Sequence, residues 1–117
     1  MSESYSGWKN IPLAGLILEA GNAAHYKTGA WRAFRPVWGE AKCVQCFICW
    51  VYCPDTSILT QNGQVLGFDL EHCKGCGICA AECPVNKKVR REAEKEGQTI
   101  SRDDPRLCIR MVEEKTI

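Results

Sequence analysis

The clearest pattern of apolar and polar positions lies in the middle of the chain, over residues 57–68, SILTQNGQVLGF. Within it, Asn62-Gly63 separates two runs that contain apolar residues. Because both central residues of a tight two-residue turn need a positive φ, this dipeptide predicts a β-hairpin with strands at residues 57–61 and 64–67.

A second β-prone run, RLCIRMV, covers residues 106–112. We expect it to pair with a strand at about residues 32–37. Such a pairing would close the central part of the chain from both ends.

Helices are expected near both ends of the chain. A helix is predicted over residues 12–20, with Gly21 just past its end. The run that follows, GNAAHYKTGAWRAFRP, is punctuated by glycine and proline and predicts irregular chain. Residues 86–97, NKKVRREAEKEG, combine Glu with Lys and Arg at helical spacing, which predicts a solvated helix that ends at Gly97.

Two shorter helical turns are expected at residues 50–53 and 80–83. Pro54 and Pro84 follow them directly, and proline inside a helix removes a hydrogen bond and clashes with the preceding turn. Both turns are therefore expected to end there.

The distribution of residue types divides the chain. Residues 1–42 lack cysteine and are rich in glycine, alanine and aromatic residues, and cannot form a core by themselves. We expect residues 1–34 to be an extended N-terminal arm and residues 35–117 to be an α+β domain. A charged insertion is expected within that domain, at about residues 86–105.

Composition limits the class of protein. A formal net charge of +1 argues against a basic nucleic-acid binder. The polar N-terminus has no signal-peptide layout, and the longest apolar stretch is about half the length of a membrane span. We therefore expect a cytoplasmic protein that binds no membrane. In that reducing compartment, nine cysteines are expected to be metal or cluster ligands rather than disulfides.

The cysteines form a repeat. CVQCFICWVYCP at residues 43–54 and CKGCGICAAECP at residues 73–84 share the pattern C-x2-C-x2-C-x3-C-P. Three closely spaced thiolates can ligate three corners of a [4Fe-4S] cluster, and in two-cluster ferredoxins the fourth cysteine ligates the other cluster. Four-cysteine zinc sites instead use two C-x2-4-C pairs with a longer spacer, so zinc is the weaker alternative.

The repeat predicts a bacterial-type ferredoxin domain with two [4Fe-4S] clusters and a pseudo-two-fold repeat. The ligands of cluster one are expected to be Cys43, Cys46, Cys49 and Cys83. The ligands of cluster two are expected to be Cys73, Cys76, Cys79 and Cys53.

The two motifs differ between their cysteines. Gly75 and Gly77 stand where the first motif has Gln45 and Phe47. Glycine lets backbone N–H groups approach the sulfurs, which raises the reduction potential, and the aromatics Phe47, Trp50 and Tyr52 would exclude water from cluster one. We therefore expect cluster one to have the lower potential. The alternative is that these aromatics simply pack against a neighbour.

Other candidate residues receive no catalytic role. Cys108 fits neither motif and is expected to be a small buried hydrophobe within a strand. His25 and His72 belong to no recognisable catalytic set, and the chain shows no phosphate-binding glycine loop. The predicted function is therefore electron transfer rather than catalysis on this chain.

Residues 27–85 resemble the delta (ferredoxin-like) subunit of 2-oxoacid:ferredoxin oxidoreductases of the pyruvate and 2-oxoisovalerate type. Besides the cysteine motifs, the residues that carry the resemblance are Thr28, Gly29, Trp31, Arg32, Arg35, Pro36 and Phe47. The resemblance implies catalytic subunits that carry thiamine diphosphate, and external ferredoxin as the electron acceptor. The residues after Cys83 depart from the family pattern.

Two alternatives remain open at the level of the sequence. One is an independent soluble two-cluster ferredoxin with the arm folded onto its own clusters. The other is a relay subunit of another redox complex. The near-neutral charge and the apolar arm favour a docked subunit, because a diffusing carrier gains from strong charge.

Overall fold

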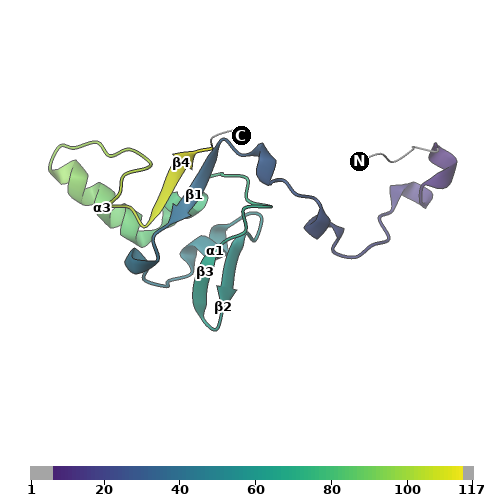
Figure 1. The fold of residues 1–117 in the computed structure, drawn as a ribbon, viewed down its shortest axis with the longest axis horizontal. Helices are drawn as coiled ribbons and strands as arrows, with labels where there is room; N and C mark the ends of the chain where they lie inside the picture. Colours follow the sequence, from purple (N-terminus) through teal and green to yellow (C-terminus); the bar gives the residue numbers. More distant parts are fainter. Residues whose placement is uncertain (1–6, 115–117) are drawn as a thin grey trace.

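The computed structural model describes residues 7–114 and is elongated, measuring 65 × 33 × 23 Å along its principal axes. The strands and longer helices gather at one end, and the N-terminal segment extends away from them (Figure 1). Residues 1–6 of the expected arm and residues 115–117 of the expected domain lie outside the described residues.

Two antiparallel sheets of two strands each form the body. In one, β1 (Phe34–Trp38) pairs with β4 (Ile109–Glu113). In the other, β2 (Ile58–Gln61) pairs with β3 (Gln64–Phe68). Both predicted pairings are confirmed, and the first joins segments far apart in the sequence.

The hairpin turn has the predicted chemistry. Asn62 and Gly63 have φ values of 52° and 74°, the left-handed conformation that a two-residue turn requires. Beyond the turn, Ile58 and Val65 are buried, whereas Leu59 and Leu66 are exposed. The hairpin therefore contributes one apolar face to the core and leaves apolar side chains on the other.

Two short helices carry the third cysteine of each motif. They are α1 (Ile48–Tyr52) and α2 (Ile78–Glu82), and each begins two residues earlier than predicted. Cys53 and Cys83 follow them in extended conformations, with ψ values of 117° and 123°. A residue before proline is pushed out of the helical region by the proline ring, so both helices end before the prolines, one residue earlier than predicted.

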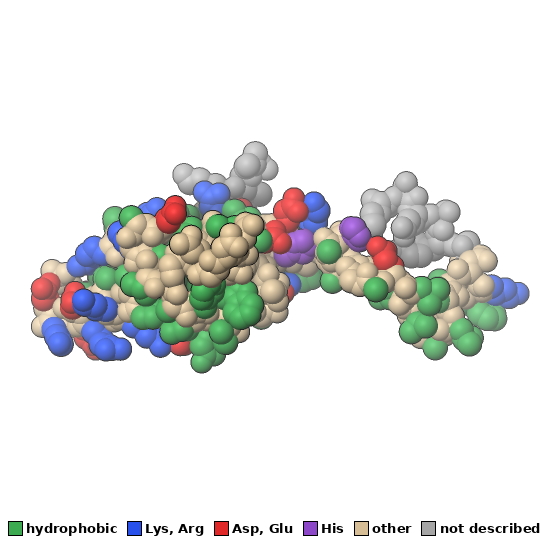
Figure 2. Space-filling view, turned by 90° about the horizontal axis from the view of Figure 1, so that it is seen from below, with side chains coloured by type: hydrophobic (Ala, Val, Ile, Leu, Met, Phe, Trp, Pro, Cys, Tyr) green, Lys and Arg blue, Asp and Glu red, His purple; other side chains and the backbone are tan. Residues whose placement is uncertain are grey.

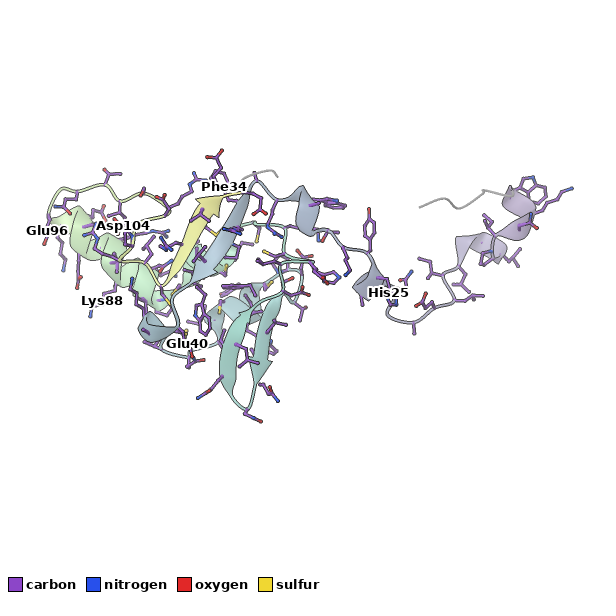
Figure 3. The ribbon with its side chains drawn as sticks, in the orientation of Figure 1. His25, Phe34, Glu40, Lys88, Glu96 and Asp104 are labelled. Atoms are coloured by element: carbon purple, nitrogen blue, oxygen red, sulfur yellow. The ribbon has the colours of Figure 1, made fainter. Side chains whose placement is uncertain are left out.

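The long helix α3 (Pro84–Lys95) begins two residues before the predicted start. Pro84 occupies its first turn, where the missing N–H costs nothing and the fixed φ suits a helix. Gly97 has a φ of 70° and stops the helix as predicted. Lys88 on α3 and Glu96, which directly follows the helix, lie at the opposite end of the molecule from the arm (Figure 3).

The helix expected at residues 12–20 is wrong. The structure has only a 3-10 turn at Leu13–Gly15, and Ala14 inside it has a φ of 62°. Short helices are unstable in water unless an apolar face is covered, and no other part of the described chain covers this one.

The buried core is small. It is centred on Ala80, Cys83, Cys108, Ile109 and Met111, which come from α2, the residue that follows it, β4 and the residue before β4. A core of this size leaves the cysteine loops dependent on specific polar contacts.

Asn86 on α3 supplies such contacts and is fully buried. Its Nδ2 donates to the carbonyls of Ala80 and Ile109, at 2.9 and 2.8 Å. Its Oδ1 accepts from the amides of Cys108 and Ile109, at 2.8 and 3.2 Å. One side chain therefore joins α3, α2 and β4.

We expect Asn86→Ala to lower the free energy of unfolding by about 3 kcal/mol, because it leaves buried backbone groups without partners. The measurement is the midpoint of thermal bleaching of the visible cluster absorbance, taken anaerobically. Lys88→Ala on the exposed side of the same helix is the control and should change the free energy by less than about 0.5 kcal/mol. Equal midpoints for the two variants would contradict the assignment.

Candidate cluster-binding sites

The eight motif cysteines line two separate cavities. The first is lined by Cys43, Cys46, Cys49 and Cys83. The second is lined by Cys53, Cys73, Cys76 and Cys79. Each cavity thus combines three cysteines of one motif with the last cysteine of the other.

The loops of the two motifs have the same backbone conformation. Gln45 and Phe47 have φ values of 56° and 64°, and Gly75 and Gly77 have φ values of 68° and 79°. Left-handed conformation costs non-glycine residues roughly 1–2 kcal/mol. Gln45 gains a contact there, because its Oε1 accepts from the amide of Val65 on β3 at 2.7 Å.

The sequence predicts fewer N–H contacts to sulfur around cluster one, and the described residues have one such contact at the first cavity and two at the second. The Gln45 amide lies 3.4 Å from Cys43 Sγ, and the Gly75 amide lies 3.4 Å from Cys73 Sγ. The second cavity does have a further donor, since the Ser57 amide lies 3.2 Å from Cys53 Sγ. The additional donor at the second cavity comes from the bend after the first motif, and not from a glycine.

The expected aromatic shield is limited to one residue. Phe47 lines the first cavity and contacts Trp50 edge-to-face, with ring centroids 6.3 Å apart. Trp50 and Tyr52 are exposed and do not line it. The difference in potential between the clusters stays a prediction.

Both cavities are apolar around the sulfurs. Burial raises the pKa of the Cys49 and Cys73 thiols, and raises that of Cys79 to about 12. Neighbouring thiols add to each rise. A buried thiol with a raised pKa requires a strongly cationic group to become a thiolate, and binding such a group is linked to folding. The donor sets therefore fit iron–sulfur clusters.

Cys108 is buried as predicted, but it lies one residue before β4 rather than within it. It lines the first cavity, and its Sγ lies 3.6 Å from the Gly39 carbonyl oxygen. Burial, with help from the nearby Cys83 and Cys43, raises the pKa of Cys108 to about 12. The residue therefore stays a protonated thiol beside the ligand set.

Both histidines contact residues of the N-terminal arm. His25 is on the arm, far from both cavities, and pairs with Glu19 at 3.1 Å (Figure 3). The His72 ring lies between the Asp69 carboxylate, 2.8 Å from Nδ1, and the Ala24 carbonyl oxygen, 2.9 Å from Nε2. His72 therefore holds the end of the free arm against the second cysteine loop.

The cysteine motifs do not predict a contact that the structure shows between the arm and this loop. Thr28 and Arg32 donate hydrogen bonds to it, although more than forty residues separate Thr28 from its acceptor on His72. The only signal in the sequence was the Thr28–Arg32 run itself, which carried the family resemblance without a physical role.

No helix among residues 7–114 is long and apolar enough to cross a membrane.

A family model described as a 4Fe-4S dicluster domain matches residues 38–90. The chain is 49% identical over 92 residues to the pyruvate synthase subunit PorD of Thermotoga maritima, which covers 78% of this chain and 93% of that protein. It is 44% identical over 84 residues to the PorD subunit of Methanocaldococcus jannaschii, covering 70% of this chain and 98% of that protein.

The chain belongs to the PorD family.

Its resemblance to the delta subunits is thereby confirmed, and so are its two [4Fe-4S] clusters. The chain is also similar to a subunit of an enzyme other than pyruvate synthase. Over 59 residues the chain is 50% identical to the delta subunit of the NADH-dependent phenylglyoxylate dehydrogenase of Aromatoleum evansii, covering 50% of this chain and 62% of that protein.

Proposed function

We propose that this chain is the electron-transfer subunit of a cytoplasmic 2-oxoacid:ferredoxin oxidoreductase. It takes electrons from catalytic subunits that carry thiamine diphosphate and passes them to an external ferredoxin. The observation that carries the proposal is the combination of two four-cysteine cavities in one small body with an arm whose large apolar side chains are exposed. We assign no catalytic residue to this chain.

The cavities support a crossed, pseudo-two-fold ligation. Cluster one is held by Cys43, Cys46, Cys49 and Cys83, and cluster two by Cys73, Cys76, Cys79 and Cys53. A [4Fe-4S] cluster supplies one-electron transfer at low potential when bound. The chain's residues hold the sulfurs, limit access of water and orient N–H donors toward the thiolates. Each cluster also ties the first motif to the second.

The arm is proposed to dock on partner subunits. Trp8 is 78% exposed and Leu13 is 94% exposed, so the arm does not fold onto its own domain as a free carrier would require. Other exposed apolar residues of the arm are Ile11, Leu16, Ile17, Leu18 and Tyr26. They gather on the part of the molecule that extends from the body (Figure 2).

The boundary between arm and domain follows from the contacts. Thr28 and Gly29 are buried, whereas almost all residues from Gly7 to Lys27 are exposed. We therefore draw the end of the free arm near residue 27, and keep residues 35–117 as the ferredoxin domain with its charged insertion at about residues 86–105.

The proposal is tested on native material purified anaerobically through a tag on this chain. We expect co-elution with larger subunits in a particle far larger than 13.1 kDa. Adding a 2-oxoacid to that complex should produce the electron paramagnetic resonance (EPR) signals of reduced [4Fe-4S] clusters. A small particle that stays oxidised in the presence of every 2-oxoacid would favour an independent ferredoxin or a relay subunit of another redox complex.

A further inference from the structure

Four successive backbone carbonyls before the second cysteine loop accept hydrogen bonds from the segment 28–32. The Leu70 carbonyl accepts from Arg32 Nη1, and the Cys73 carbonyl accepts from the same atom at 3.2 Å. Between them, the Glu71 carbonyl accepts from the Gly29 amide at 2.7 Å, and the His72 carbonyl accepts from Thr28 Oγ1 at 2.9 Å. We name residues 28–32 the clasp.

Arg32 is the buried centre of the clasp. Its side chain is 9% exposed, and its Nε lies 3.2 Å from Glu114 Oε2, with Nη2 3.3 Å from Oε1. Glu114 follows β4 directly, and its amide donates to the Ala33 carbonyl at 2.8 Å. The guanidinium therefore joins the arm, the second loop and the end of the β1–β4 sheet.

The segments around Gly29 and Gly75 approach their neighbours so closely that neither position has room for a side chain. A Cβ at Gly29 would clash with the Leu70 carbonyl, and a Cβ at Gly75 would clash with the Phe34 carbonyl. The clasp is thus packed against the loop as well as bonded to it. Burying the guanidinium costs free energy, because the charged group is removed from water.

We propose that Arg32 is a positioning residue for cluster two, which fixes the second cysteine loop and raises the reduction potential of the cluster by placing a positive charge beside it. The inference rests on the proposed ligation of cluster two by Cys73, Cys76, Cys79 and Cys53.

The physical reason is the charge difference between the redox states. The reduced cluster carries one more negative charge than the oxidised cluster, so a nearby cation favours reduction, and low solvent exposure strengthens the effect. The Arg32 guanidinium lies close to the proposed ligand Cys73, since its Nη1 donates to the Cys73 carbonyl at 3.2 Å. Lys42, which precedes Cys43 in the first motif, is exposed and bonds instead to the Pro105 carbonyl.

The test is an EPR-monitored redox titration of the intact complex, with iron content measured on each sample. Arg32→Gln should lower the midpoint of one cluster and leave the other unmoved. A tenfold change in the ratio of reduced to oxidised cluster corresponds to about 59 mV for a one-electron couple, and we expect a shift of about that size. Phe47→Gly, which changes the first loop only, identifies the cluster-one midpoint.

The variant Glu114→Gln distinguishes a shift in midpoint caused by charge from one caused by loosened structure. It removes the negative partner of Arg32 and should shift the cluster-two midpoint upward, opposite in sign to Arg32→Gln. Arg32→Lys keeps the charge but loses the forked hydrogen bonds, so the midpoint should stay near that of the wild type while iron is lost faster on heating. Arg35→Gln, an exposed arginine on β1, is the matched control and should move neither midpoint.

The outcomes are distinct. Shifts of the same sign for Arg32→Gln and Glu114→Gln, or a midpoint unmoved by Arg32→Gln at full iron content, would overturn the inference. A wild-type complex without two EPR-active clusters would instead overturn the proposed function. If Arg32→Gln loses iron, the sign of the Glu114→Gln shift decides the question.

Discussion

The double variant Cys53→Ser/Cys76→Ser is expected to retain about half of the wild-type iron, that is about four atoms per chain. Both residues line the second cavity, so the two substitutions damage one cluster and leave the other with four thiolates. Cys53→Ser/Cys46→Ser should lose nearly all the iron, because it removes one ligand from each cavity. Iron and sulfide analysis of anaerobically prepared protein measures the difference.

The variant Cys53→Ser/Cys76→Ser has one substitution in each motif. The variant Cys53→Ser/Cys46→Ser has both substitutions in the motif of residues 43–54. The expected result is therefore the reverse of what ligation within each motif would produce. Cys108→Ala is the matched control, since Cys108 lies beside the first cavity without belonging to either motif, and it should keep the wild-type iron content. The crossed assignment would be wrong if Cys53→Ser/Cys76→Ser lost nearly all its iron while Cys53→Ser/Cys46→Ser kept half.

A chain that lacks residues 1–26 should keep both clusters but no longer co-purify with the larger subunits. Within the deleted segment, the described residues 7–26 are almost all exposed, so their loss removes little from the fold. A deletion that continues to residue 30 would also remove Thr28 and Gly29 from the clasp, and would confuse loss of docking with damage to the second loop. Pull-down through a tag on a catalytic subunit, with iron analysis of the truncated chain, measures both effects.

Point substitutions on the arm provide a finer test of docking. Leu13→Ser and Leu16→Ser should each weaken association about tenfold, since burying one leucine contributes about 1.5–3 kcal/mol and 1.4 kcal/mol is a factor of ten. Lys9→Ala is the matched control on the same arm and should bind as the wild type does. Undiminished co-purification of the truncated chain would show that the arm is not the anchor.

Local chemistry made part of the fold predictable. The Asn62-Gly63 turn needs two left-handed residues, and few other dipeptides accept that conformation. Likewise Pro54 and Pro84 force Cys53 and Cys83 out of the helical region. The start of α3 at Pro84 escaped prediction because proline ends one helix and begins the next, and its position alone does not distinguish the two uses.

The helix expected near residue 13 shows where local reasoning fails. Apolar spacing is only half of the requirement for an amphipathic helix, since the apolar face must also be covered. Leu13 and its neighbours on the arm are uncovered in this chain, and the backbone there is extended with isolated turns.

The two cysteine motifs and the hairpin were determined by the sequence itself, because thiol spacing and turn chemistry act over a few residues. Strand propensity marked the runs that become β1 and β4, but their antiparallel pairing joins segments far apart in the sequence. Only the tertiary structure decided that Gln45 and Phe47 imitate the glycine loop, that Asn86 joins three elements, and that Arg32 is buried against the carbonyls of residues 70 and 73. These features depend on groups tens of residues apart in the chain. Their energies arise from burial and geometry that exist only once the chain has folded.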